Sequence, residues 1–186
     1  KLEKFIIENN SIAQSLKKDY QDFFKKKELK KYKSFKNIRV IGMGGSSLGT
    51  EAIYDFLKYK IKKNFFFINN LNPRLKKENN KKTLNLIVSK SGNTIETIIN
   101  SNIFVKKKDK NIFITENKKN YLYLLGQKLK ADIIHHNNYI GGRYSVLSEV
   151  GMLPAELMGL DSKKFRQFNN LIKNRKYLNA LISNVS

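Results

Sequence analysis

The sequence of 186 residues contains no cysteine, no tryptophan and only two prolines. Without cysteine, disulfide bonds and thiolate metal sites are excluded. No apolar run is long enough to span a bilayer, and the first residues, Lys1–Phe5, lack the apolar segment of a signal peptide. We therefore expect a cytoplasmic protein that does not associate with membranes.

Acidic residues are also scarce, with 15 Asp and Glu against 37 Lys and Arg and a formal net charge of +22. Such an excess can indicate nucleic-acid binding. The basic residues, however, are spread over predicted helix faces, and they are not interleaved with aromatic residues as in proteins that bind single-stranded nucleic acid. We therefore expect no nucleic-acid partner, and we attribute the charge to a general abundance of lysine along the chain, as a biased genome base composition produces. Such a positive field can still attract anionic substrates.

The sequence does contain five short apolar runs, separated by stretches with helical spacing. Runs of this length that are apolar throughout are typical of strands buried on both faces. The five runs are Ile38–Ile41, Phe65–Ile68, Leu84–Val88, Ile112–Thr115 and Ile133–His135. Helical spacing covers residues 47–58, 93–107 and 121–130, and more weakly Pro73–Asn80. The alternation predicts an α/β fold with a doubly wound, mostly parallel five-stranded sheet flanked by helices.

Both ends of the chain show helical patterns. Apolar residues at three- and four-residue spacing predict one long helix from Glu3 to about Lys31. The chain from Ser145 onward is also predicted to be helical, with a stop at Gly159, a new start at Asp161 and a helix from Ser162 to Arg175. We divide the chain into a helical segment (1–35), a ligand-binding domain (36–160) and a helical tail (161–186). Because the tail ends without a recognisable closing feature, we expect that a second domain follows it.

The loop Gly42–Gly49 follows the first apolar run and opens a helix. Glycine permits close approach of a ligand, and the helix N-terminus offers free N–H groups to an anion. The loop is not a P-loop, since no Gly-Lys-Ser/Thr follows at the required spacing, and Ser47 stands where a dinucleotide fingerprint has its last glycine. A phosphate loop and a plain tight turn both remain open interpretations.

The loop Ser89–Thr94 lies between a predicted buried strand and a helix. The hydroxyls of Ser89, Ser91 and Thr94 can converge with backbone N–H groups on one phosphate. An ordinary N-cap would explain one polar residue here, but it would not explain the cluster. We therefore interpret this loop as a phosphate site, to which Lys90 adds a cation.

A third loop, Gly141-Gly142-Arg143, also follows a predicted strand. An open α/β sheet binds ligands at the carboxyl ends of its strands, which an arginine in this loop can reach. Its planar, permanently charged guanidinium suits an oxyanion or an enediolate. The alternative is an arginine on the surface of a turn.

These loops, together with Gly151-Met152-Leu153-Pro154, resemble the phosphoglucose isomerase family over about Asn37–Asp161. The first two motifs occur more widely in sugar isomerase (SIS) domains, and the Gly-Gly-Arg motif is more specific. The resemblance implies an SIS-type α/β/α sandwich. It also implies interconversion of glucose 6-phosphate and fructose 6-phosphate through a cis-enediolate, without a metal or cofactor.

The resemblance implies a role for each loop. Arg143 is the implied catalytic residue, stabilising negative charge on the enediolate, with Gly142 beside it at the reacting end of the sugar. The residues implied to bind substrate, mainly at its phosphate, are Gly45, Ser46, Ser89, Lys90, Ser91, Thr94 and Gly142. No metal site is expected, since the adjacent His135 and His136 would point to opposite faces of a strand.

The family's general base, its ring-opening histidine and a further lysine lie in a second domain, downstream of the Gly-Gly-Arg loop. After Arg143 this chain offers only Glu149 and Glu156 as glutamates, without a matching motif, and no histidine. We therefore expect the chain to bind the phosphate but to be inactive alone. The resemblance also implies that the full-length protein is a homodimer. Two alternatives are a non-catalytic sugar-phosphate sensor and a dual-specificity phosphoglucose/phosphomannose isomerase.

Overall fold

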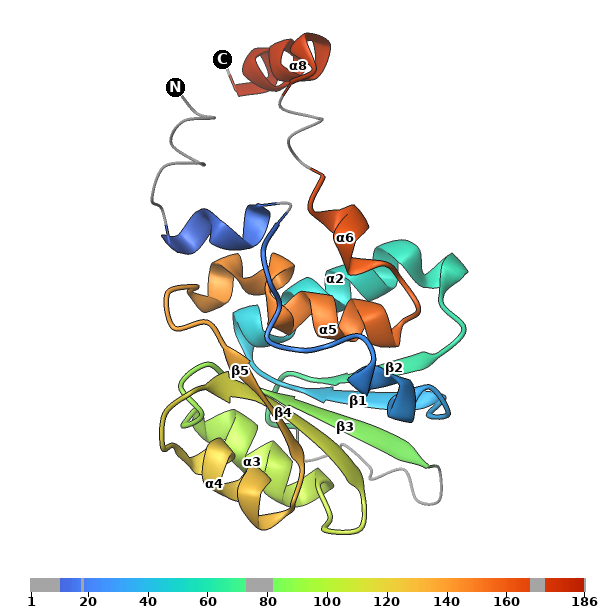
Figure 1. The fold of residues 1–186 in the computed structure, drawn as a ribbon, viewed down its shortest axis with the longest axis vertical. Coiled ribbons are helices and arrows are strands. Elements are labelled where there is room, and N and C mark those ends of the chain that lie inside the picture. The colour runs from blue at the N-terminus through green and yellow to red at the C-terminus, as the bar shows by residue number, and fades with distance from the viewer. Residues whose placement is uncertain (1–10, 18, 73–81, 168–172, 186) are drawn as a thin grey trace.

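The computed structural model describes residues 11–17, 19–72, 82–167 and 173–185. In this part of the chain, five strands form one sheet in the order β2-β1-β3-β4-β5, and every neighbouring pair is parallel (Figure 1). The strands are β1 (Asn37–Ile41), β2 (Asn64–Ile68), β3 (Thr83–Val88), β4 (Lys110–Glu116) and β5 (Asp132–His136). The predicted parallel sheet and its α/β class are confirmed.

Helices cover both faces of the sheet, as Figure 1 shows. One face carries α3 (Ile95–Phe104) and α4 (Tyr121–Lys128), and the other carries α2 (Leu48–Leu57) and α5 (Glu149–Leu157). Because successive strand residues point to opposite faces, β3 contributes Leu84, Leu86 and Val88 to the core under α2 and α5, and Ile87 to the core under α3 and α4. The three central strands β1, β3 and β4 are buried on both faces, as their apolar runs predict, whereas the edge strands β2 and β5 are only partly buried.

A buried polar row crosses the α3–α4 face of the sheet. Arg39, Asn85 and Asn111 are register partners on β1, β3 and β4. The Arg39 guanidinium donates to Asn85 Oδ1 at 2.9 Å, and Asn85 Nδ2 donates to Asn111 Oδ1 at 2.8 Å. Buried polar groups are stable only when they are hydrogen-bonded, so this row favours one register of the three strands.

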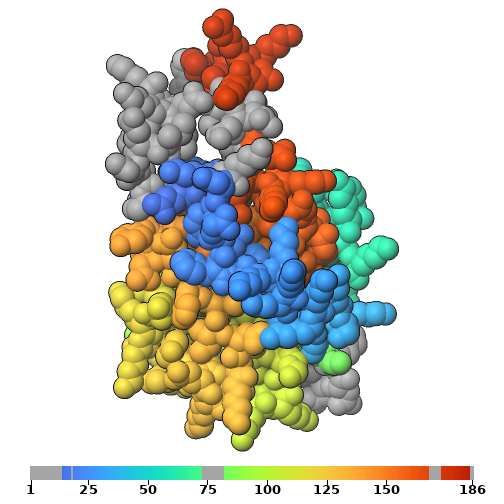
Figure 2. Space-filling view, in the orientation of Figure 1, coloured from blue at the N-terminus to red at the C-terminus, as the bar shows by residue number. Residues whose placement is uncertain are grey.

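The long N-terminal helix predicted from Glu3 to Lys31 is wrong over the described residues. A 3₁₀ helix η1 (Ser11–Leu16) is followed by a second one, η2 (Glu28–Tyr32), and the described residues of the connection between them, 17 and 19–27, are not helical. The apolar residues of this connection do not form one helix face, and the Phe23 side chain is exposed. Phe24 is buried in the core that includes α5, and the backbone N–H of Phe23 donates to Glu149. The space-filling view shows this blue segment lying against the orange and red segment (Figure 2).

The C-terminal part also differs from the prediction. The helix predicted over Ser162–Arg175 ends at Phe165, so that α6 (Ser162–Phe165) is a single turn, and α8 (Arg175–Val185) follows separately. The chain leaves the helix at Arg166, whose side chain turns into the domain to bind the Leu147 carbonyl. The predicted helix stop at Gly159, which has φ of +87°, is confirmed. The predicted helix start at Asp161 is also confirmed, since its side chain caps α6 by accepting a hydrogen bond from the Lys163 N–H.

The remaining helices of the described residues are short 3₁₀ helices: η3 (Gly44–Ser46), η4 (Lys58–Lys60) and η5 (Gly142–Leu147). The predicted helix over Pro73–Asn80 lies outside the described residues. Among the helices that the structure describes, none is both long and apolar enough to cross a membrane.

Candidate functional site

The strand order brings the first two loops together. β1 pairs with both β2 and β3, so the chain winds outward in opposite directions from the β1–β3 pair. In open α/β sheets, ligands bind outside the carboxyl ends of the strands at such a switch point. The loops Gly42–Gly49 and Ser89–Thr94 follow β1 and β3 directly. A Cβ atom built on Gly42 would lie 2.9 Å from the Val88 carbonyl oxygen. The two loops are therefore neighbours at the switch point.

The third loop reaches the same place from β5. Its turn η5 packs on η3, and a Cβ atom on Gly45 would overlap the Gly142 carbonyl oxygen and lie 2.9 Å from the Arg143 nitrogen. The Ser145 hydroxyl lies 2.7 Å from the Gly142 carbonyl oxygen and 3.3 Å from that of Gly45. The backbone of Arg143 consequently lies against the loop that contains Ser46, although the two are far apart in sequence.

Ser89 and Thr94 form the centre of the second loop. Ser89 is 2% exposed, and its hydroxyl lies 2.9 Å from that of Thr94. Thr94 is the N-cap residue of α3, but its side chain makes no capping hydrogen bond. The hydroxyl that would normally satisfy the helix N-terminus is directed to Ser89 instead. Ser91 is exposed, and its hydroxyl accepts a local hydrogen bond from the Asn93 N–H.

The same loop is fixed against the start of α4. Gly92 has φ of +67°, and a Cβ atom there would overlap Asn120 Oδ1, so that only glycine fits. The Gly92 carbonyl accepts from the Leu122 N–H, and the Asn93 side chain accepts from the Tyr121 N–H. This contact explains the Gly-Asn pair of the motif. Sequence reasoning missed Asn120, although an asparagine just before a helical pattern is an N-cap signal.

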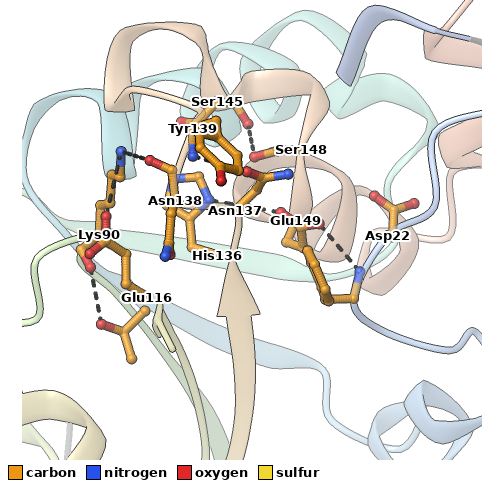
Figure 3. A network of polar contacts seen from close by, with 12 residues as sticks. Asp22, Lys90, Glu116, His136, Asn137, Asn138, Tyr139, Ser145, Ser148 and Glu149 are labelled. Atoms are coloured by element: carbon orange, nitrogen blue, oxygen red, sulfur yellow. Dashed lines mark hydrogen bonds and ion pairs between the residues drawn. The ribbon is translucent and has the colours of Figure 1, made fainter. Parts of the chain in front are cut away.

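Lys90 connects the second loop to the third. Its ammonium donates to the Asn138 carbonyl at 2.7 Å and lies 3.5 Å from Glu116 Oε1 (Figure 3). Asn138 lies between β5 and the Gly-Gly-Arg turn, so Lys90 supports the chain that leads to Arg143. The Arg143 side chain itself is exposed.

The two glutamates that follow Arg143 are held by structural contacts. Glu149 is fully buried, and its Oε1 accepts from the Tyr20 hydroxyl at 2.8 Å and from the Phe23 N–H at 3.2 Å. Burial, followed by this carboxylate, raises the pKa of Tyr20 above its usual value. Glu156 accepts from the Ser162 N–H at 2.7 Å and pairs with Lys26. Both glutamates thus contact other segments of the domain, while Glu149 Oε2 accepts no hydrogen bond in the described structure.

Among the described residues there is no group of three metal-binding side chains that could hold an ion. On β5, His135 is half-buried and His136 is buried. The His136 Nδ1 atom lies 3.8 Å from Glu149 Oε2.

A comparison with protein families agrees with this geometry. The family model described as phosphoglucose isomerase matches residues 5–181. The chain belongs to the phosphoglucose isomerase family. Solved structures share the fold: a protein from Thermus thermophilus described as hypothetical has a TM-score of 0.70 at 24% identity, covering 89% of this chain and 43% of that one. The tagatose-6-phosphate ketose/aldose isomerase of Escherichia coli has a TM-score of 0.55 at 19% identity, covering 74% and 42%.

Curated relatives in this family are named glucose-6-phosphate isomerase. The one from Methanocaldococcus jannaschii is 35% identical over 188 residues, which cover 88% of this chain and 46% of the relative. The one from Acholeplasma laidlawii is 33% identical, covering 89% and 45%, and the one from Borreliella afzelii is 38% identical, covering 65% and 26%. The chain thus spans less than half the length of these three relatives.

Proposed function

We propose that this chain binds the phosphate of glucose 6-phosphate and fructose 6-phosphate, as part of a phosphoglucose isomerase. The observation that carries the proposal is the contact of Gly45 with Gly142 beside the β1–β3 switch point. Together with the contact between Gly42 and the Val88 carbonyl, it supports a site at which hydroxyl groups from two loops and an arginine from a third share one edge of the sheet. A hydroxyl-rich anion is the ligand that such a set of groups suits.

The phosphate end of the substrate would lie between the loops after β1 and β3. There the hydroxyls of Ser46, Ser89 and Thr94 donate to phosphate oxygens, with Gly45 permitting close approach and Ser91 contributing at the rim. The first turn of α3 adds N–H groups and the positive end of the helix dipole, both of which favour an anion. Lys90, which lies within the loop after β3, contributes its positive charge.

The carbon end of the sugar would lie toward the turn η5. Arg143, preceded by Gly142, would stabilise the negative charge that develops on the substrate oxygens when a proton leaves C2, forming a cis-enediolate. The proton then returns at C1 to complete the aldose–ketose conversion. Glu149 and Glu156 make structural contacts, which supports our proposal that the base that removes the C2 proton comes from residues outside this chain.

A single-turnover experiment with glucose 6-phosphate tritiated at C2 tests this division of labour. We expect the chain to bind the sugar phosphate, measured by titration calorimetry, and to release no tritium to water. Release of tritium would contradict the assignment of the base to another part of the protein. If that release were abolished by Glu149→Gln but not by Glu156→Gln, then Glu149 would be the base.

A further inference from the structure

The end of the turn that contains Arg143 is bound by a buried arginine from outside the loop. Arg166 is 3% exposed, and its Nε and Nη2 atoms both donate to the Leu147 carbonyl, at 3.2 Å and 2.8 Å. Leu147 is the last residue of η5. A buried guanidinium stabilises a structure only when its charge and its donors are satisfied, so the position of Leu147 is coupled to the groups that neutralise Arg166.

Asp22 supplies that charge from the N-terminal segment. Its two carboxylate oxygens accept from Arg166 Nη1 at 3.0 Å and from Nη2 at 2.5 Å, in the bidentate arrangement that arginine forms best. The guanidinium also lies 4.9 Å from the centre of the Tyr20 ring. Two segments from opposite ends of the described chain therefore meet at the carbonyl that ends the Arg143 turn.

The residue that begins α5 is held by the same N-terminal segment. Glu149 accepts from Tyr20 and Phe23, and its other oxygen faces His136 at the end of β5. Figure 3 shows Asp22, Glu149 and His136 around the start of this helix, with the Asn137–Tyr139 segment alongside. The loop between β5 and α5 is thus fixed at its α5 end by contacts that do not involve the phosphate loops.

Contacts inside the turn transmit this placement to Arg143. The Ser148 hydroxyl donates to the Ser145 carbonyl at 2.7 Å, and the Ser145 hydroxyl donates to the Gly142 carbonyl at 2.7 Å. The Tyr144 N–H donates to the Gly141 carbonyl at 2.9 Å. Because these bonds fix the shape of the turn, a movement of Leu147 and Ser148 is expected to move the Arg143 backbone with it.

We propose that Asp22 and Arg166 are positioning residues for the sugar-phosphate site, which act through the Leu147 carbonyl to set where Arg143 stands relative to Ser46 and Ser89. The proposal rests on the function proposed above, in which Arg143 faces the carbon end of the ligand. Among the described residues, the hydrogen bonds of the Asp22–Arg166 pair go to each other and to Leu147, and none goes to the phosphate loops. Loss of the ion pair should therefore affect the Arg143 end of the ligand more than its phosphate end.

Two probes separate the ends of the ligand. Inorganic phosphate reports on the phosphate loops alone, whereas 6-phosphogluconate carries a carboxylate at the end opposite its phosphate and reports on Arg143 as well. We expect Asp22→Asn and Arg166→Gln to weaken binding of 6-phosphogluconate about fivefold, within the usual range of coupling between connected residues. Their affinity for inorganic phosphate should stay within about twofold of the unsubstituted chain. If Arg166→Gln does not fold, Arg166→Lys takes its place. It keeps the positive charge but loses the planar pair of donors, so it should bind 6-phosphogluconate more weakly than the unsubstituted chain does.

A double-mutant cycle with Arg143→Gln distinguishes positioning from general destabilisation. If the ion pair acts through Arg143, Asp22→Asn should have little effect on 6-phosphogluconate once Arg143 is replaced. Asp132→Asn is the matched control, because it removes contacts of another partly buried aspartate with Tyr32 and Lys31, away from the loop. Asp132→Asn should lower the melting temperature without weakening the binding of either probe.

The outcomes separate this proposal from the function on which it rests. If Arg143→Gln leaves the affinity for 6-phosphogluconate unchanged, the proposed role of Arg143 fails. If Arg143→Gln weakens binding but Asp22→Asn and Arg166→Lys do not, the positioning proposal alone is overturned. Equal losses for both probes, or equal losses in Asp132→Asn, would also overturn it, since they indicate a purely structural contribution.

Discussion

Gly45 and Gly142 lie backbone against backbone, with no room between them for a single added carbon atom. This contact joins the loop after β1 to the turn after β5, and the Ser145 hydroxyl bridges both carbonyl groups. Gly45 therefore has a packing reason, in addition to any role toward a ligand, whereas a Cβ atom on Gly142 would lie 4.0 Å from the Gly45 Cα atom, an ordinary contact.

Substitution of Gly45 by alanine should disturb both stability and binding. The added methyl group would press on the Gly142 backbone, and we expect a loss of about 1–3 kcal/mol of unfolding free energy as the turn is displaced. The matched control is Gly141→Ala, because a Cβ atom there meets only the Tyr144 ring at 3.7 Å. Urea unfolding and calorimetric titration with glucose 6-phosphate should separate the two variants, and equal behaviour would refute the packing argument.

The paired hydroxyls of Ser89 and Thr94 should act as a unit toward phosphate. Ser89→Ala or Thr94→Ala removes one of two groups that lie 2.9 Å apart, and we expect each to weaken inorganic phosphate binding about tenfold. The double variant should lose less than the sum, since contacting residues are not additive.

Ser101→Ala is the control for this pair. Its hydroxyl is buried and donates to the Thr97 carbonyl at 2.6 Å within the same helix α3. It should cost stability and leave phosphate affinity unchanged. Strict additivity of the Ser89 and Thr94 effects would argue against a shared ligand.

Alkaline pH should destabilise the protein partly through Tyr20. The pKa of its phenol is raised in the folded state, by burial first and then by Glu149. In the unfolded chain the phenol loses its proton at about pH 10. The stabilising contribution is therefore complete below pH 10 and is lost as the pH rises toward the folded-state pKa. Above pH 10, the unfolding free energy of Tyr20→Phe should fall less steeply than that of the unsubstituted chain, by up to about 1 kcal/mol per pH unit. This difference is smaller than the slope expected for one full proton, because the phenol is partly exposed.

The exposed Tyr59 supplies the comparison for this pH dependence. Its side chain is 77% exposed, so Tyr59→Phe should leave the alkaline slope as it is in the unsubstituted chain. Urea unfolding at several pH values between 9 and about 11.5 measures both slopes. An unchanged slope in Tyr20→Phe would contradict the assigned shift.

The sheet could be predicted from the sequence because its strands are apolar on both faces and bounded by polar loops. Each strand extends one to three residues beyond its predicted run, where a polar residue such as Asn37 or Thr83 continues the pairing. The row of Arg39, Asn85 and Asn111 could not be predicted in this way, since its partners lie on three different strands. Apolar periodicity reports burial, and it carries no information on which polar residues meet across a sheet.

The N-terminal segment shows where local pattern fails. Tyr20, Phe23 and Phe24 have helical spacing, yet the bonds to Glu149 and the burial of Phe24 hold them in a non-helical connection. Tertiary contacts outweigh helix propensity in such a short stretch. Glu149 was a candidate base by residue type alone, and only the structure identifies its buried partners. The adjacency of the loops after β1 and β3 follows from the strand order. The contact between Gly45 and Gly142 could not be predicted, because it depends on how two loops far apart in sequence pack together.

The proposal that one sugar phosphate binds across all three loops is tested most directly by amide chemical shifts during a titration of the ¹⁵N-labelled chain with glucose 6-phosphate. We predict saturable shifts at Ser46, at Ser89–Thr94 and at Gly142–Arg143, all with one dissociation constant. Shifts confined to lysine-rich segments such as Lys58–Lys63, or different constants for the loops after β3 and β5, would contradict a single site at the switch point.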